Sequence, residues 1–93
     1  MPATRPSTID LAKVDSLETL HARLARALRF PAYYGANLDA LRDLVTEGGE
    51  PRRLRFRNGA DFWRRFPDYF PRLVQVLLDA RDETEGFDVE FLP

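Results

Sequence analysis

Three short stretches of alternating apolar and polar residues, far apart in the chain, limit the folds that it can adopt. The first covers residues 8–11, the second contains Leu54 and Phe56, and the third covers residues 87–91. Such alternation predicts β-strands with one buried face. The intervening segments are long enough for helical crossovers, which join parallel strands with right-handed connections. We therefore predict an α/β fold in which four helices flank a three-stranded parallel sheet.

The first intervening segment contains signals for two helices. Ser16 is a good N-cap, and leucines at helical spacing follow it until the chain approaches Pro31. Asn37 can cap a second helix that runs to about residue 47, where Gly48-Gly49 stops it.

The second intervening segment also contains signals for two helices. Asp61 can cap a short helix that Pro67 interrupts, and Pro71 suits the first turn of a longer helix over residues 71–83. Gly86 fits a helix stop before the last strand. Polar residues alternate with apolar ones in the last two strands, so one face of the sheet should be only partly covered.

The length of 93 residues suits a single domain with a modest core. We predict a flexible N-terminus at residues 1–6 and one domain over residues 7–93. The absence of cysteine excludes a disulfide framework and thiolate sites, and no apolar run is long enough for a membrane helix or a signal peptide. A cytoplasmic protein without a metal, a cofactor or a membrane partner is therefore expected.

Arginines are concentrated in one part of the chain, at residues 52–57 and at Arg64-Arg65, with Trp63 beside them. They allow a small nucleic-acid-binding module that uses the arginine-rich second strand. The formal net charge of −1 argues against a general nucleic-acid binder. The alternative interpretation is that these arginines pair with the protein's own acids and cover an exposed strand.

The predicted second helix has an acidic side. Its leucines form one stripe, and Asp39, Asp43 and Thr46 fall on the opposite side, with the two aspartates one turn apart. This side is either a solvated surface or an anionic patch that meets cations. The two carboxylates could formally serve as an acid and a base, but nothing in the sequence indicates the desolvation that would tune them. We therefore do not expect an enzyme.

The tyrosine pair before this helix is open to two interpretations. Tyr33 and Tyr34 can close the core, or they can lie at an interface beside the carboxylates. Gly35 follows them in a turn, and we expect it to adopt a positive φ, which glycine accepts freely. His21 is the only histidine, and a packing or surface role is expected for it in preference to catalysis.

Residues 28–43, with the sequence LRFPAYYGANLDALRD, resemble the barstar family, whose members are intracellular inhibitors of ribonucleases such as barnase. The hallmark is a proline, a tyrosine pair, glycine, asparagine, leucine, aspartate, alanine and leucine, all present here in register. Weaker similarity extends over most of the chain. The resemblance implies a three-stranded parallel sheet flanked by helices, which agrees with the fold predicted from the pattern.

The resemblance also implies a binding site. Family members place the second helix and the loop before it into the active site of a ribonuclease. By resemblance, contact positions are occupied by Tyr33, Asp39, Asp43 and Thr46. Asp43 matches a carboxylate that takes the place of a substrate phosphate, and Asp79 matches a peripheral glutamate that meets a basic residue of the enzyme.

Three positions depart from the family pattern. Arg42 stands where barstar has tryptophan, Glu47 replaces a glycine, and Gly48 replaces a second contacting tryptophan. Arg42 can fold back on a carboxylate of its own surface or meet an acidic residue of the target, and we expect the second. The expected partner is a secreted or toxin ribonuclease, with the chain acting as a bacterial immunity protein or antitoxin. No direct nucleic-acid contact is expected, and the free protein should be a monomer.

Overall fold

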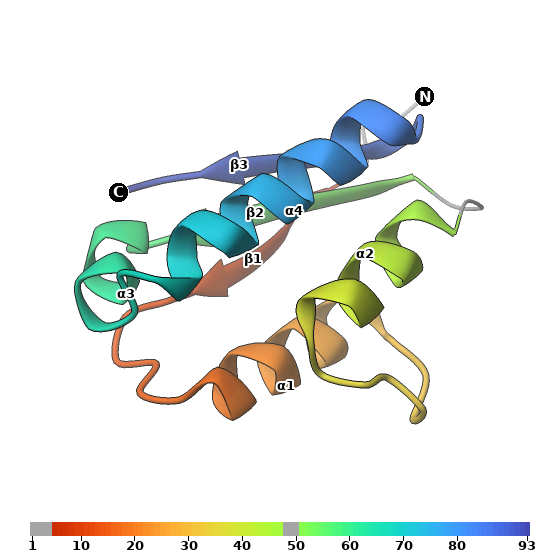
Figure 1. Cartoon of the computed structure of the whole chain (residues 1–93). Helices are drawn as coiled ribbons and strands as arrows, with labels where there is room; N and C mark the ends of the chain where they lie inside the picture. The colour runs from red at the N-terminus through yellow and green to blue at the C-terminus, as the bar shows by residue number, and fades with distance from the viewer. Residues whose placement is uncertain (1–4, 48–50) are drawn as a thin grey trace.

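The computed structural model describes residues 5–47 and 51–93. These two stretches contain three strands and four helices, which Figure 1 shows in chain order from red to blue. The predicted order of strand, helix pair, strand, helix pair and strand is confirmed. The elements are β1 (Ser7–Asp10), α1 (Leu17–Leu28), α2 (Leu38–Thr46), β2 (Arg52–Arg57), α3 (Gly59–Arg65), α4 (Tyr69–Glu83) and β3 (Phe87–Phe91).

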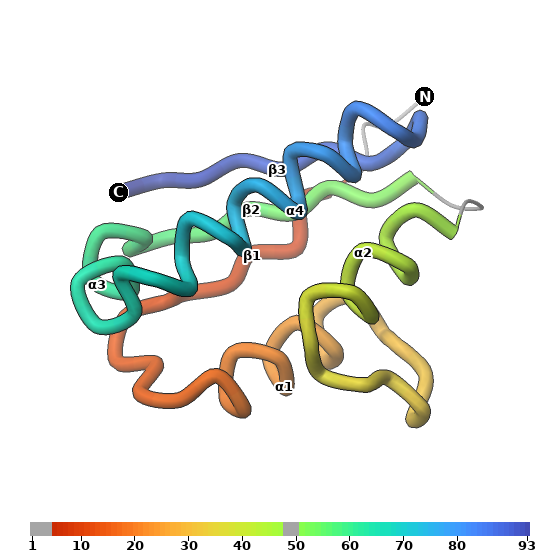
Figure 2. Tube along the Cα trace, in the orientation of Figure 1, coloured from red at the N-terminus to blue at the C-terminus, as the bar shows by residue number. Residues whose placement is uncertain are grey.

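The strands form one parallel sheet in the order β1-β2-β3. In the central strand, Leu54 is paired with Ser7 on one side and with Val89 on the other. Both crossovers, which Figure 2 traces, step in the same direction across the sheet. Right-handed connections then place the helices on one face. The predicted α/β class with a three-stranded parallel sheet and four helices is confirmed.

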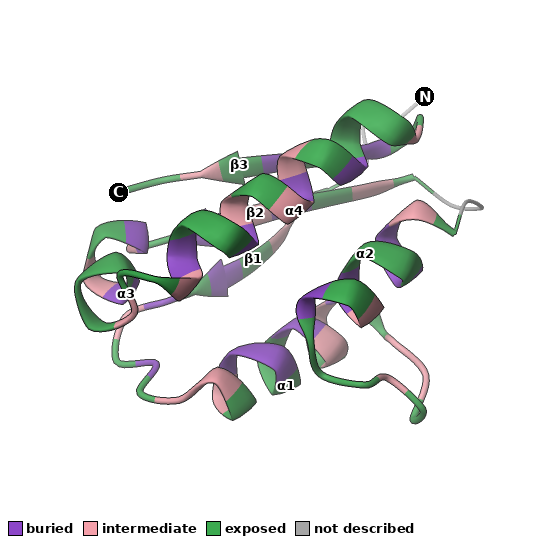
Figure 3. Cartoon of the chain, in the orientation of Figure 1, coloured by how far each residue is buried: buried purple, intermediate pink, exposed green. Residues whose placement is uncertain are grey.

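The core lies between that face and the helices. The strands contribute alternate residues to it: Ile9, Leu54, Phe56, Phe87 and Val89. α1, α2 and α4 each turn a buried stripe toward these residues, and their outward sides stay exposed (Figure 3). Burying one large apolar side chain stabilises a fold by about 1.5–3 kcal/mol. This layer therefore fixes the position of α2 against α4 and the core.

The opposite face of the sheet carries charged side chains. Three arginines of β2 alternate with its buried residues. The strand register places Arg55 beside Glu90 and Arg57 beside Asp10. Arg55 Nε donates a hydrogen bond to Glu90 Oε1 at 2.6 Å. The prediction that one face is only partly covered is confirmed, and carboxylates of the same chain border the arginine row.

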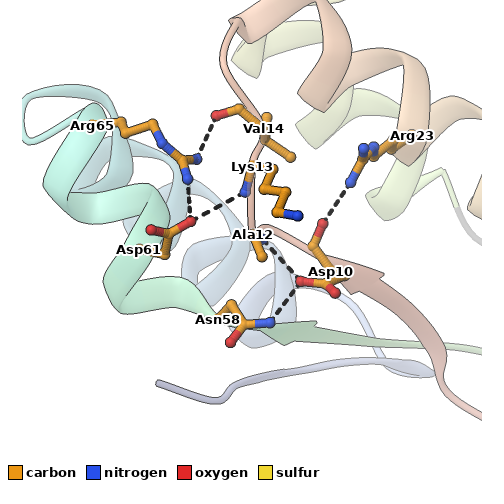
Figure 4. Close-up of polar contacts among 8 residues, drawn as sticks. All are labelled: Asp10, Ala12, Lys13, Val14, Arg23, Asn58, Asp61 and Arg65. Carbon is orange, nitrogen blue, oxygen red and sulfur yellow. Dashed lines mark hydrogen bonds and ion pairs between the residues drawn. The ribbon is translucent and has the colours of Figure 1, made fainter.

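Polar side chains also bind backbone atoms at both free edges of the sheet. Leu11 N donates a hydrogen bond to Arg57 O on β2. Because successive residues of a strand direct their N–H and C=O groups to opposite sides, those of Asp10 point away from β2, toward the free edge. Asp10 O accepts a hydrogen bond from Arg23 Nη1 at 2.8 Å (Figure 4). On β3, the outward N–H of Val89 donates to Asp88 Oδ1 at 2.9 Å.

The start of α3 differs from the prediction. The helix begins at Gly59, after Asn58, whose φ of 60° is left-handed and whose side chain makes no capping bond. Asp61 lies inside the helix, where its Oδ2 accepts from Lys13 N at 3.1 Å and pairs with Arg65 (Figure 4). The prediction that Asp61 caps the helix is therefore wrong, because its carboxylate holds the loop after β1 against α3.

The remaining boundaries lie close to those predicted. α4 starts at Tyr69 and keeps Pro71 in its first turn, and Gly86 follows the helix with a φ of 87°. The predicted stop at Gly48-Gly49 and residues 1–4 of the predicted flexible N-terminus lie outside the described residues. The boundary between residues 1–6 and 7–93 stays a prediction. Within the described part of the chain, no helix is long and apolar enough to cross a membrane.

Candidate functional site

The outward side of α2 presents the acidic residues. The side chain of Asn37 caps the helix, with Oδ1 accepting from the N–H three residues further on at 2.8 Å. Because the leucines of α2 face the core, Asp39 and Asp43 lie in solvent, one turn apart. Thr46 lies on the same side and is half-buried, and its hydroxyl donates to Arg42 O at 2.7 Å. The structure therefore brings these predicted site residues together.

The two tyrosines of the preceding loop have different surroundings. Tyr33 is 76% exposed, which is high for so large an aromatic side chain. Tyr34 is half-buried and packs against Phe30, with ring centroids 4.8 Å apart. Tyr34 therefore closes the core, as one interpretation of the pair predicts, whereas Tyr33 remains available at the surface and its role at an interface stays a prediction.

Gly35 does not have the positive φ that we expected. The left-handed residue of this turn is Ala36, with a φ of 54°. A Cβ atom on Gly35 would lie 3.3 Å from Asn37 Nδ2, which donates to Gly35 O at 3.2 Å. The prediction for Gly35 is therefore wrong: space beside the capping asparagine favours glycine there, and backbone strain falls on Ala36.

Replacing Ala36 with glycine should stabilise the protein by about 0.5–1 kcal/mol. A left-handed conformation costs an L-residue roughly 1–2 kcal/mol, and the greater freedom of glycine in the unfolded chain offsets part of the gain. Urea unfolding measures the change. The control is Ala40→Gly in the first turn of α2, which should instead destabilise by up to about 1 kcal/mol. A destabilised Ala36→Gly variant would contradict the assignment of strain to this residue.

A buried histidine connects the loop to α4. His21 on α1 is 1% exposed. Its Nδ1 lies 2.6 Å from the Tyr34 hydroxyl, and its Nε2 lies 2.6 Å from the Tyr69 hydroxyl. A neutral imidazole donates from one nitrogen and accepts at the other, so both hydrogen bonds form together. Burial lowers the pKa of His21 and raises the pKa of both tyrosines, which keeps all three groups neutral.

Lowering the pH should destabilise the fold through His21. Because its pKa in the folded state lies below the ordinary 6.5, the unfolded chain binds a proton that the native chain does not. The stabilisation is complete above about pH 6.5 and is lost as the pH falls toward the folded pKa, by up to about 1.4 kcal/mol per pH unit. Urea unfolding at neutral pH and at roughly pH 5.5 measures it. His21→Gln should flatten this dependence, and equal slopes for both proteins would exclude His21 as its source.

Two small clefts flank the acidic residues, each with a volume of about 180 Å³. Pockets for small-molecule ligands usually measure roughly 300–1,000 Å³, so these clefts suit single side chains of another protein better. A hollow of about 400 Å³ at the free edge of β1 is larger, but it lies away from the acidic side of α2. The first cleft is lined by Tyr33, Tyr34, Gly35, Ala40, Asp43 and Leu44, and the second by Asn37, Leu38, Asp39, Tyr69 and Arg72.

α4 adds further charged groups beside α2. Asp79 is exposed and accepts a hydrogen bond from Gln75 Nε2 at 2.8 Å. Arg42 reaches across from α2 and pairs with Glu83, with Nε 3.3 Å from Oε2 and a second bond from Nη2 to Oε1. Glu83 raises the pKa of Arg42, and Asp79 and Asp43 act in the same direction. In the free chain Arg42 therefore folds back on a carboxylate of its own surface, and the expected contact with an acidic residue of the target stays a prediction.

The arginine row of β2, which consists of Arg53, Arg55 and Arg57, is less suited to binding nucleic acid than the sequence alone indicates. It lies on the open face of the sheet, bordered by acidic side chains, and Arg55 is paired with Glu90. Phosphate groups would compete with these carboxylates for the arginines. The residues described contain no group of three or more His, Cys, Asp or Glu side chains arranged to hold a metal ion.

The sequence profile of the family described as "Barstar (barnase inhibitor)" matches residues 4–92. This chain belongs to the barstar family. A protein of Bacillus subtilis (strain 168) named "Putative ribonuclease inhibitor YrdF" is 36% identical over 81 residues, which cover 85% of this chain and 88% of that protein. Membership of the barstar family, inferred from residues 28–43, is confirmed and extends over nearly the whole chain.

Within this barstar-family fold, the structure places the predicted contact residues around one surface. Tyr33 and Asp43 line one cleft, Asp39 lines the other, and Asp79 lies close enough to Arg42 to help raise the pKa of its guanidinium. The sequence analysis missed Glu83, Arg72 and the hydrogen bonds of His21. Part of the signal was available, because Arg72, Gln75, Asp79 and Glu83 recur at helical spacing on one side of α4.

Proposed function

We propose that this protein inhibits a barnase-like ribonuclease by placing the acidic side of α2 and the preceding loop in the active site of the enzyme. The observation that carries this proposal is the exposed pair Asp39 and Asp43, one turn apart on α2 and each beside a cleft of side-chain size. The family description and the name of the Bacillus relative support the same function.

The mechanism is competition for the cations that bind phosphate. A ribonuclease active site is concave and cationic because it must hold the RNA backbone. Carboxylates on a folded helix offer the same charge without the scissile bond, and Asp43 takes the place of a substrate phosphate. Charge pairs buried between two proteins offset their desolvation only when they are fully hydrogen-bonded. A helix held rigidly against the core favours such complete hydrogen bonding. Complementary electrostatic fields speed the association of the two proteins.

The cleft between Tyr33 and Asp43 is suited to a planar cationic side chain of the enzyme. An arginine or histidine entering it would stack on an exposed tyrosine ring and pair with the carboxylate at its side. Asp39 and Thr46 would contact the enzyme at either end of the same helix side. Asp79 on α4 would meet a basic residue at the rim.

Arg42 lies within this surface, and its contact with the enzyme stays a prediction. Its guanidinium is held by Glu83 in the free chain, although both side chains are about half exposed. Exposed ion pairs contribute only about 0–1 kcal/mol, so a partner that offers a better-placed carboxylate can draw Arg42 away from Glu83. A partner without one would leave the pair intact.

The partner proposed here is a secreted or toxin ribonuclease, and the site of action is the cytoplasm of a bacterium. A monomeric inhibitor that binds the enzyme one to one would protect cellular RNA, as an immunity protein or antitoxin does. No direct contact with nucleic acid is part of this mechanism.

Titration of purified barnase with the protein tests the proposal. Ribonuclease activity should fall in proportion to the inhibitor added, and the complex should form with one copy of each chain. Binding to RNA alone, measured in the same buffer, should be undetectable. Tight binding to RNA without inhibition of the enzyme would favour the arginine-rich strand as the functional surface instead.

A further inference from the structure

Arg72 is a second cation on the surface that carries the acidic residues. It is exposed in the first turn of α4, and its guanidinium carbon lies 5.9 Å from the centroid of the Tyr69 ring. It lines the cleft at the start of α2, together with Asp39. This cleft therefore presents a positive charge and a negative charge side by side.

The two arginines of this surface are held differently. Arg42 is neutralised by two bonds to Glu83. For Arg72, no residue in the described stretches supplies a carboxylate at ion-pair distance. The guanidinium of Arg72 is therefore available to a carboxylate of a partner, whereas Nε and Nη2 of Arg42 already donate to a carboxylate of the same chain.

The position of Arg72 is supported from beneath. The Tyr69 ring on which it rests is tied through its hydroxyl to buried His21 at 2.6 Å. A guanidinium against a fixed aromatic ring has fewer orientations to lose on binding than one extended into solvent. Its planar fork of donors also matches the geometry of a carboxylate.

We infer that Arg72 is a specificity-determining contact of the inhibitory surface and that it binds a carboxylate at the rim of the target ribonuclease. This inference rests on the proposed function. With Asp39 beside Arg72, the complementary rim has an acidic side chain next to a basic one. A uniformly basic rim would meet Arg72 with repulsion, so this position discriminates among ribonucleases whose active sites are otherwise similar.

Binding to purified barnase tests this role. Arg72→Ala should weaken binding about tenfold, the loss expected for a hydrogen-bonded charged contact, and Arg72→Glu should weaken it further. The matched control is Arg81→Ala, which changes an exposed arginine on the opposite side of the same helix and should bind like the wild type. Circular dichroism establishes that each variant is folded.

A second measurement identifies the group that Arg72 meets. Surface carboxylates of barnase are changed to amides one at a time, and each enzyme is titrated with wild type and with Arg72→Ala. One amide variant should weaken the wild type and remove the difference between the two inhibitors. The inference is overturned if Arg72→Ala binds like the wild type, or if no carboxylate is coupled to it. In either case, weak binding by Asp43→Ala would leave the proposed function standing, whereas failure of the wild type to inhibit barnase would overturn both.

Discussion

Replacing Asp43 with alanine is expected to weaken inhibition of barnase by about thirtyfold or more and to leave the fold intact. The carboxylate is exposed on the outer side of α2 and lines the cleft beside Tyr33, where a cation of the enzyme would enter. Removing a residue of this kind costs binding at least about 2 kcal/mol, which corresponds to roughly thirtyfold in Kd. The fold should persist because the core contacts of α2 come from its opposite side.

Titration of ribonuclease activity measures this loss, and urea unfolding establishes that stability is unchanged. Glu90→Ala is a suitable control, because it removes an exposed carboxylate from the open face of the sheet and changes net charge by the same amount. The control should inhibit like the wild type. Equal potency of Asp43→Ala and the wild type would exclude the acidic side of α2 as the inhibitory surface.

Replacing His21 with alanine is expected to destabilise the protein by about 2–4 kcal/mol. The change leaves a cavity beneath α1 and removes the hydrogen-bond partner of the Tyr34 and Tyr69 hydroxyls. Since these tyrosines line the two clefts beside Asp43 and Asp39, inhibition should also weaken, although His21 itself is not at the surface.

Two further variants separate packing from hydrogen bonding. Tyr34→Phe and Tyr69→Phe keep the rings and remove one hydroxyl each, so each should cost about 1 kcal/mol, less than His21→Ala. Urea unfolding gives the stabilities, and titration of barnase at a temperature where every variant is folded gives the potencies. Unchanged stability of His21→Ala would show that the histidine does not hold the loop to α4.

Much of the fold could be predicted because local patterns agreed with one another. Alternation in the strands, the caps at Ser16 and Asn37 and the length of the crossovers all favoured the same parallel sheet, and the structure has both caps. The prediction for Asp61 was wrong because an aspartate near the start of a helix can either cap that helix or bind a distant loop with the same carboxylate. Only the tertiary fold brings Lys13 to it.

The site could be predicted only where it depends on helical spacing. Spacing placed Asp39 and Asp43 on the outer side of α2, but it gave no direction for the side chains of the preceding loop. The pairing of Arg42 with Glu83 joins residues that are 41 positions apart, and the hydrogen bond of His21 to Tyr69 joins residues 48 apart. Such contacts depend on how α4 packs against α1 and α2, which no local pattern encodes.

The side chains that bind backbone atoms at the sheet edges affect how the protein behaves in crowded solution. A strand with unpaired peptide groups is a template for neighbouring molecules and can start aggregation. Here Arg23 donates a hydrogen bond to an outward carbonyl of β1, and Asp88 accepts one from an outward amide of β3. Both outer strands are therefore partly unavailable for pairing with the sheet of another copy. This disfavours edge-to-edge association even when the protein accumulates to high concentration.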